Sequence, residues 1–235
     1  MLEMIWKPTL YGFDTCKEFA EAFRLNSDDL ILSNAYIYEP YFGCMENLNC
    51  YVIFQEKYGA GEPTDEMVEA IYADSRKMGE HKRVIAIGGG TVIDISKLFS
   101  LKNVSPVDDL YDGKLEVVKD KELVLVPTTC GTGSEATCNA IVAVPEEEVK
   151  KGIVNTAMIP DYVILDAQVI KKLPKSIVAA TGVDALAHVV ECYTSKKATP
   201  LSNTYALAGA KLIFENIREA YCNPDNMEAK SNMML

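Results

Sequence analysis

Asp184 and His188 stand four residues apart in the stretch AATGVDALAHVVECY, residues 179–193, and His188 is one of two histidines in the chain. On a helix this spacing places a carboxylate oxygen and an imidazole nitrogen on one face, where both can reach a single metal ion. A structural hydrogen bond between the two side chains is the alternative, and Thr181 with Asp184 also has the T-x-x-D spacing of a helix cap. The residues alone leave open the choice between a metal site and a structural pair.

A run of three glycines, Gly88 to Gly90, follows an apolar run in the stretch IGGGTVID, residues 87–94. In a turn from strand to helix, glycines leave backbone N–H groups and the positive end of the helix open to a phosphate. The stretch is neither a Walker loop nor the fingerprint G-x-G-x-x-G, because Ile93 occupies the place of the third glycine. A plain tight turn is the alternative, and the spacing of Asp94 and Lys97 is compatible with a simple surface ion pair.

A second polar loop, PTTCGTGSE at residues 127–135, follows another apolar run. Hydroxyl groups and free backbone N–H groups in such a loop can bind phosphate, ribose or amide groups at the carboxyl end of a parallel strand. The alternative is an ordinary Ser/Thr-rich turn. Because two such loops follow neighbouring strands, a shared binding site is favoured over two unrelated turns. The hydroxyl-bearing residues of the loop are Thr128, Thr129, Thr132 and Ser134.

Strands and helices that would position these loops alternate along the first three quarters of the chain. Continuous runs of Val, Ile and Leu are typical of strands buried on both faces, so the pattern predicts a parallel sheet with covering helices, an α/β fold. One helix is expected from Thr64, which has the residue type of an N-cap, and another from Thr91. The expected strands are residues 29–34, 50–55, 83–90, 122–129 and 162–166.

After residue 173 the pattern becomes helical, which predicts a boundary between an α/β domain at 1–173 and a helical domain at 174–235. Helices are expected from Thr181 to about residue 195, from Leu201 to about residue 221, and from Asp225 onward. Asp225 and Glu228 have the spacing of a capping box. The last helix is too short to complete a bundle, so we expect the chain to stop within an incomplete helical domain.

The net charge, apolar runs and cysteines of the sequence indicate which class of partner the protein binds and where it is expected to reside. The 235 residues carry a formal net charge of −11, which disfavours nucleic acid and acidic lipid and favours a small-molecule partner. No apolar run reaches the length of a membrane span, and the first residues lack the pattern of a signal peptide. Seven cysteines without a C-x-x-C pair fit reduced thiols. We therefore expect a cytoplasmic protein.

Taken in order, the stretches GGGTVIDISK, PTTCGTGSE and AATGVDALAHVVECY resemble the iron-containing (group III) alcohol dehydrogenases, over essentially the whole chain. The resemblance implies a dehydroquinate synthase-like architecture, in which an α/β domain binds NAD or NADP and a helical domain holds Fe²⁺ or Zn²⁺. It implies an enzyme that transfers a hydride between nicotinamide and a small primary alcohol or aldehyde, and a homo-oligomer such as a dimer. The stretch FQEKYGAGEPTDEM points, within this family, to members that interconvert 4-hydroxybutyrate and succinate semialdehyde.

The resemblance also assigns roles residue by residue. Gly88, Gly89, Gly90 and Thr91 match the pyrophosphate loop with Asp94 beside it, while Thr128, Thr129, Thr132 and Ser134 match ribose and nicotinamide contacts. Lys151 is similar in place to a lysine near the cofactor, a weaker match. The two metal ligands matched in this sequence are Asp184 and His188.

Two departures from the family pattern affect function. The family has two further histidine ligands in later helices, and this chain has no histidine after His188. The metal site is therefore expected to be incomplete in this chain, so a catalytically inactive nucleotide-binding fragment is the alternative to an active dehydrogenase. A dehydroquinate synthase-like lyase is a further alternative. Asn34 stands where many NAD-preferring members have an acid, so the preference for NAD is weakly indicated.

Overall fold

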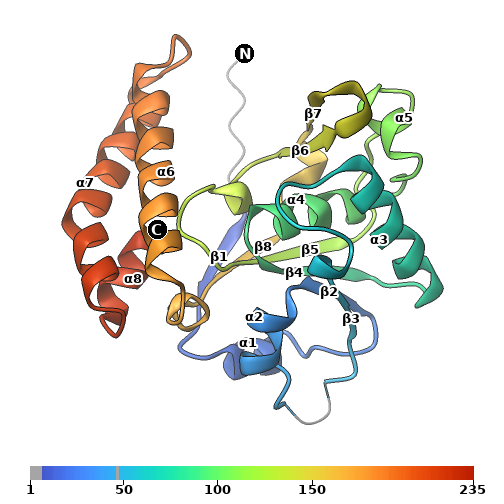
Figure 1. Ribbon diagram of the computed structural model, residues 1–235, viewed down its shortest axis with the longest axis horizontal. Coiled ribbons are helices and arrows are strands. Elements are labelled where there is room, and N and C mark those ends of the chain that lie inside the picture. The colour runs from blue at the N-terminus through green and yellow to red at the C-terminus, as the bar shows by residue number, and fades with distance from the viewer. Residues whose placement is uncertain (1–6, 46–47) are drawn as a thin grey trace. The chain divides into compact units, whose positions relative to one another are not determined.

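The computed structural model describes residues 7–45 and 48–235 (Figure 1). The prediction about a signal peptide falls largely on residues 1–6, which lie outside the described residues. Among the residues that are described, no helix combines the length and the apolar character needed to cross a membrane.

The five predicted strands are confirmed, and they pair in parallel within one sheet. Every residue of the second strand is buried, as expected for a strand covered on both faces. In the described part of the chain the sheet has the order β1-β8-β5-β4-β2-β3. The bounds are β1 Thr9–Gly12, β2 Asp29–Ser33, β3 Tyr51–Phe54, β4 Arg83–Gly88, β5 Glu122–Pro127 and β8 Tyr162–Leu165.

Helices cover both faces of this sheet, with α1 and α2 on one side and α3 and α4 on the other (Figure 1). The short connecting segments are single turns of 3-10 helix, among them η1 at Gln55–Lys57 and η2 at Ser134–Ala136. The helices of this unit are α1 Cys16–Ala22, α2 Ala35–Tyr41, α3 Asp65–Lys77, α4 Gly90–Phe99 and α5 Val107–Tyr111.

The order of the strands creates a switch point between β2 and β4. The chain leaves β2 toward β3 at one edge of the sheet, and it leaves β4 toward β5 in the opposite direction. In open α/β sheets, ligands bind outside the carboxyl ends of the strands at such a point. The residues that follow Ser33 and Gly88 are therefore the ones to inspect for a binding site.

The predicted cap of α3 is confirmed, because the Thr64 hydroxyl accepts a hydrogen bond from the Met67 N–H at 3.1 Å. We expect Thr64→Ala to lower the free energy of unfolding by about 1 kcal/mol, since an N–H group at the helix end loses its partner. Thermal unfolding should show a fall in Tm of about 2–4 °C for a protein of this size. Thr64→Ser, which keeps the hydroxyl, is the control, and an equal loss in both variants would contradict the capping role.

An antiparallel hairpin was not predicted. Its strands are β6 Asn139–Val144 and β7 Val149–Val154, and Glu148 turns the chain between them with a φ of 56°. The residues of β7 alternate between exposed and half-buried, so they lack the continuous apolar run that marks the buried strands. The hairpin packs against α4, and this contact becomes important for the site.

Contacts between Cα atoms divide the chain into two compact units, residues 1–127 with 134–164, and residues 128–133 with 165–235. The boundary predicted at 173/174 stays a proposal. In the second unit a turn of 3-10 helix, η5 at Ala167–Ile170, precedes the helices. These are α6 Lys175–Thr194, α7 Pro200–Cys222 and α8 Met227–Met234.

Two helix starts in this second unit differ from the prediction. The first helix begins at Lys175, not at Thr181, and the Thr181 hydroxyl donates to the Ile177 carbonyl inside the helix at 2.9 Å. Thr181 and Asp184 therefore form no capping box. The last helix is capped by Asn226, whose side chain accepts from the Ala229 N–H at 3.0 Å, so the capping box predicted at Asp225 is also wrong. The helix predicted from Leu201 is confirmed within two residues.

Candidate functional site

The glycine run forms the turn from β4 into α4, at the switch point of the sheet. Gly88 is required by packing, because a Cβ there would lie 2.6 Å from the Cβ of buried Val92. Gly89 is the N-cap of α4 with φ −80° and ψ −171°, and it offers no side-chain cap. The first N–H groups of a helix have no partner within the helix. This turn therefore presents backbone donors and a helix dipole that fit a phosphate group.

Thr91, in the first turn of α4, connects this loop to another segment. Its hydroxyl donates to the Gly61 carbonyl at 2.8 Å. Gly61 has a φ of +86°, a conformation that favours glycine. The YGAGEP segment is thereby held beside the glycine run. The role of Thr91 in binding pyrophosphate stays a prediction.

The interpretation of Asp94 and Lys97 as a surface ion pair is wrong. The Lys97 side chain is fully buried, and its Nζ donates to Asp94 Oδ1 at 3.1 Å, to Thr137 Oγ1 at 2.9 Å and to the Asn139 carbonyl at 2.8 Å. Asp94 Oδ2 accepts from the Ile141 N–H at 3.3 Å. Burial lowers the pKa of Lys97, and the Asp94 carboxylate opposes that shift.

This cluster joins α4 to the start of the hairpin and to the loop before it. The Thr137 hydroxyl donates to the Ser134 carbonyl at 3.1 Å, so Lys97 braces the segment that contains Ser134. Burial also raises the pKa of the Glu135 carboxyl, which lies near Lys97. Sequence reasoning missed Glu135 and Thr137, although Glu135 ends the PTTCGTGSE stretch. Their position follows from the hairpin, which was not predicted.

The hydroxyl loop begins where β5 ends, and Pro127 is the register partner of Gly88 on the neighbouring strand. Both polar loops therefore start at the same edge of the sheet. Thr128 is buried, Thr129 is half-buried and Thr132 is exposed. The assignment of these hydroxyl groups to ribose and nicotinamide stays a prediction.

Gly131 fixes the hydroxyl loop to the first helix of its own unit. A Cβ at Gly131 would lie 2.8 Å from the Cβ of Thr181 and 2.9 Å from the Thr181 carbonyl oxygen. The loop backbone and α6 thus approach each other so closely that only glycine fits without movement.

Asn34 follows β2 directly and is buried. Its amide donates to Gln55 Oε1 at 3.2 Å and to Glu56 Oε2 at 3.0 Å. The predicted ribose contact therefore lies beside a carboxylate from η1, which sequence reasoning did not identify. The strand register explains the contact, because Ser33 and Phe54 are partners and the residues after them meet.

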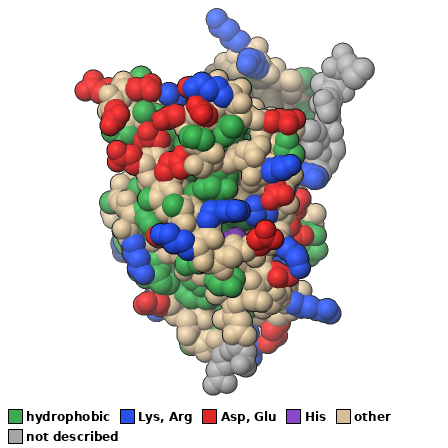
Figure 2. Space-filling view, turned by 90° about the vertical axis from the view of Figure 1, so that its right-hand side faces the viewer, with side chains coloured by type: hydrophobic (Ala, Val, Ile, Leu, Met, Phe, Trp, Pro, Cys, Tyr) green, Lys and Arg blue, Asp and Glu red, His purple; other side chains and the backbone are tan. Residues whose placement is uncertain are grey.

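Lys151 lies on β7 among acidic side chains. Its Nζ is 3.0 Å from Glu147 Oε1, 3.5 Å from Asp112 Oδ1 and 3.8 Å from Asp108 Oδ1. The contact with Glu147 is the first of the causes that raise the pKa of Lys151. Acidic side chains gather on the upper part of the face shown in Figure 2. The proximity of Lys151 to a cofactor stays a prediction.

Asp184 and His188 share one face of α6, as predicted from their spacing. His188 Nε2 lies 3.6 Å from Asp184 Oδ1, and the two side chains are 53% and 44% exposed. An oxygen and an imidazole nitrogen are ligands that suit Fe²⁺ or Zn²⁺. Within residues 7–45 and 48–235, no group of three or more His, Cys, Asp and Glu side chains is placed to hold a metal ion. The pair fits part of a ligand set.

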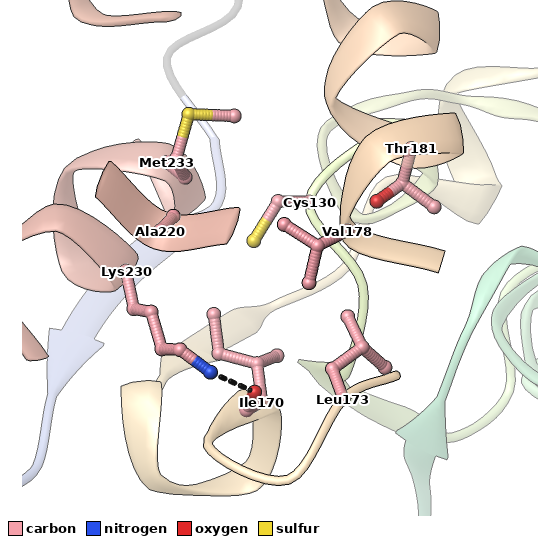
Figure 3. A pocket seen from close by; sticks show the side chains of 8 residues that line it. All are labelled: Cys130, Ile170, Leu173, Val178, Thr181, Ala220, Lys230 and Met233. Atoms are coloured by element: carbon pink, nitrogen blue, oxygen red, sulfur yellow. Dashed lines mark hydrogen bonds between the residues drawn. The ribbon is translucent and has the colours of Figure 1, made fainter. Parts of the chain in front are cut away.

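A small cavity in the helical unit does not extend the site. It encloses about 10 Å³, roughly the room of one water molecule. Lys230 is buried at its wall and donates to the Ile170 carbonyl at 2.8 Å (Figure 3). It also donates to the Lys171 carbonyl at 2.8 Å. The cavity is otherwise lined mainly by apolar groups, so it is part of the packing of α8 on η5. Its lining residues are Cys130, Ile170, Leu173, Val178, Thr181, Ala220, Lys230 and Met233.

Comparisons with known families agree with this arrangement. Residues 9–167 match the family described as iron-containing alcohol dehydrogenase, and residues 178–235 match the C-terminal part of the Fe-containing alcohol dehydrogenase family. The chain is 41% identical over 208 residues to 4-hydroxybutyrate dehydrogenase of Clostridium kluyveri, an alignment that covers 88% of this chain and 55% of the relative. It is 36% identical to sulfoacetaldehyde reductase of Bilophila wadsworthia, covering 74% of this chain and 45% of that protein.

A solved structure shows the same fold. Sulfoacetaldehyde reductase from Bifidobacterium kashiwanohense, in complex with NAD⁺, superimposes with a TM-score of 0.83 at 25% identity, covering 99% of this chain and 65% of that one. The chain spans about half the length of the curated relatives that it matches.

Proposed function

Because the chain belongs to the iron-containing alcohol dehydrogenase family, we propose that it takes part in NAD-dependent hydride transfer between nicotinamide C4 and the carbinol carbon of a small primary alcohol. We propose 4-hydroxybutyrate and succinate semialdehyde as the alcohol and its aldehyde, supported by the relative from C. kluyveri. Residues 1–173 would form the dinucleotide-binding domain, and residues 174–235 would belong to a helical metal-binding domain.

The observation that carries this proposal is the turn between β4 and α4. It lies at the switch point of a parallel sheet, and α4 begins on a glycine without a side-chain cap. Backbone N–H groups at such a helix start bind a dinucleotide pyrophosphate. The hydroxyl groups from Thr128 to Ser134 would orient the ribose and the nicotinamide, so that the ring is held at reacting distance from the alcohol.

Asp184 and His188 would provide two ligands for the divalent metal of the family. When bound, such a metal supplies Lewis acidity that favours loss of the alcohol proton. The two side chains share one helix face, and their nearest polar atoms are 3.6 Å apart, so both could reach one ion.

The pyrophosphate assignment is tested by Gly89→Val. The backbone of Gly89 is extended, a conformation that valine adopts readily, so the helix should form while the side chain crowds the phosphate. We expect at least about a tenfold rise in the Kd for NADH by calorimetric titration, which corresponds to about 1.4 kcal/mol.

Gly152→Val is the matched control for that experiment. A Cβ at Gly152, on the exposed strand β7, meets no atom closer than 3.9 Å. The control should leave the Kd unchanged. Equal affinity in the Gly89 variant and the wild type would contradict the pyrophosphate assignment.

The substrate proposal is tested on the purified chain with Fe²⁺ supplied, by following NADH formation. Faster turnover with 4-hydroxybutyrate than with 1-butanol would support the carboxylated substrate. Equal turnover would contradict the substrate, and the absence of turnover with both would contradict a catalytic role for this chain.

A further inference from the structure

The Glu56 carboxylate lies at the carboxyl end of β2, although it belongs to the segment that follows β3. Its Oε2 accepts from the Asn34 amide at 3.0 Å, and its Oε1 accepts from the Ala35 N–H at 2.8 Å. Both contacts join positions 21 or 22 residues apart in the sequence. The exposed Glu56 side chain thus sits where the strand of Asn34 ends.

The strand register explains this position. β3, β2 and β4 are adjacent and parallel, and Ser33 is the partner of both Phe54 and Ile87. The residues that follow these three partners emerge at one edge of the sheet, at the switch point described above. The Ser33 hydroxyl also donates to the Ile87 carbonyl at 2.7 Å, which ties the end of β2 to the start of the glycine run.

A dinucleotide bound at the glycine turn must extend its adenosine toward the end of the neighbouring strand. In sheets of this type the group at that strand end meets the 2′ position of the adenosine ribose. A carboxylate there accepts a hydrogen bond from a 2′-hydroxyl and repels a 2′-phosphate. Asn34 carries no charge, so by itself it would not discriminate in this way.

The charge of Glu56 is available for this role. Among the ion pairs of the described residues, none includes Glu56, and the neighbouring Lys57 lies over the Phe54 ring at 5.1 Å. The geometry therefore leaves an exposed carboxylate, held in place by an amide and a backbone N–H, beside the turn that fits a pyrophosphate.

We propose that Glu56, positioned by Asn34, provides the negative charge that selects NAD over NADP. The inference rests on the proposed function, since it needs a dinucleotide on the glycine turn. It adds to the expectation drawn from Asn34, because the acid comes from η1, the turn that follows the neighbouring strand β3.

A purely structural role for Glu56 predicts a different result. Its Oε1 accepts from the first N–H of α2, whose N-cap residue Asn34 makes no side-chain cap. Removing that cap would weaken α2 and would change the affinities for both dinucleotides by the same factor. A selective role changes their ratio.

The experiment measures the Kd values of NADH and NADPH by calorimetric titration of the full chain. The key variant is Glu56→Gln, which removes the charge and keeps an acceptor oxygen. Glu39→Gln is the matched control, because Glu39 is an exposed glutamate on α2, the helix whose first N–H donates to Glu56. We expect the wild type and the control to bind NADH at least about tenfold more tightly than NADPH, and Glu56→Gln to lower this ratio about tenfold.

A rescue variant distinguishes the loss of the negative charge from a general destabilisation of the fold. Asn34→Asp in the Glu56→Gln background returns a carboxylate to the same strand end and should restore the preference for NADH. An unchanged ratio in Glu56→Gln, with NADH still bound by the wild type, overturns the inference and leaves the proposed function standing. Failure of the wild type to bind either dinucleotide overturns the cofactor site of the proposed function, and with it the inference.

Discussion

Lys97→Met is expected to lower the free energy of unfolding by about 3 kcal/mol, near the lower end of the range for breaking a buried ion pair. The substitution removes three hydrogen bonds and leaves the Asp94 carboxylate without its cation. The lower end applies because the Asp94 side chain is 15% exposed and can regain some water. The measurement is the shift of the urea unfolding transition.

Lys77→Met is the matched control for that prediction. Asp74 and Lys77 have the same spacing on a helix and a contact of 2.7 Å, but their side chains are 40% and 75% exposed. An exposed pair contributes about 0–1 kcal/mol, so this variant should unfold nearly like the wild type. An equal fall in the free energy of unfolding in both variants would show that the buried network of Lys97 stabilises the fold no more than an exposed ion pair does.

A double variant separates the pair from the rest of the network. Asp94→Asn together with Lys97→Met removes both charges, so the cost of an unpaired buried carboxylate disappears. We expect the double variant to be more stable than Lys97→Met alone. If the free energy of unfolding of the double variant falls by the sum of the two single losses, the two side chains act independently.

Gly131→Ala is expected to lower the free energy of unfolding of the helical unit by about 1–3 kcal/mol. The new methyl group would lie 2.9 Å from the Thr181 carbonyl oxygen and 3.0 Å from its Cα, so the loop or α6 must move. The measurement is the urea transition followed by far-ultraviolet circular dichroism, which is dominated by helices.

Gly152→Ala is the control for this variant. The same methyl group at Gly152 meets no atom closer than 3.9 Å, and the change also removes a glycine from a strand interior. Unchanged or slightly raised stability is expected there. A harmless Gly131→Ala would show that the hydroxyl loop can separate from α6 without cost.

The sheet could be predicted because its strands are buried on both faces. Residues such as Leu30, Ile31 and Leu32 form continuous apolar runs that few other structures explain. The hairpin β6–β7 escaped prediction because its second strand has the sequence VKKGIV, in which two lysines and a glycine interrupt the apolar pattern. Local patterns are strongest where burial is complete.

The helix starts were harder to predict, because more than one residue can cap a helix. Thr181 has the right residue type and spacing, yet its hydroxyl is satisfied by the Ile177 carbonyl within a helix that began six residues earlier. Serine, threonine and asparagine side chains make such local bonds in several settings. Spacing alone does not decide which setting applies.

Candidate site residues could be proposed from the sequence where one segment carries the chemistry, and contacts between distant segments could not. The glycine turn and the pair of Asp184 and His188 each lie within one stretch of sequence. The contacts of Lys97 and Glu56 join residues 40 and 22 positions apart, so only the tertiary structure shows them. The sequence therefore indicates which residue types a site contains, but it does not indicate which distant residues contact them.

The buried Lys230 has a consequence for the order of events during synthesis. Its bonds join α8 to the carbonyls of Ile170 and Lys171, which are 60 and 59 residues earlier in the chain. At the usual rate of translation a ribosome needs about 3–12 s to add that many residues. Until then neither carbonyl has the Lys230 ammonium as a partner, although the Ile170 carbonyl can still accept from the Leu173 N–H. This corner of the nascent helical unit is therefore held less firmly and is more open to proteases and chaperones.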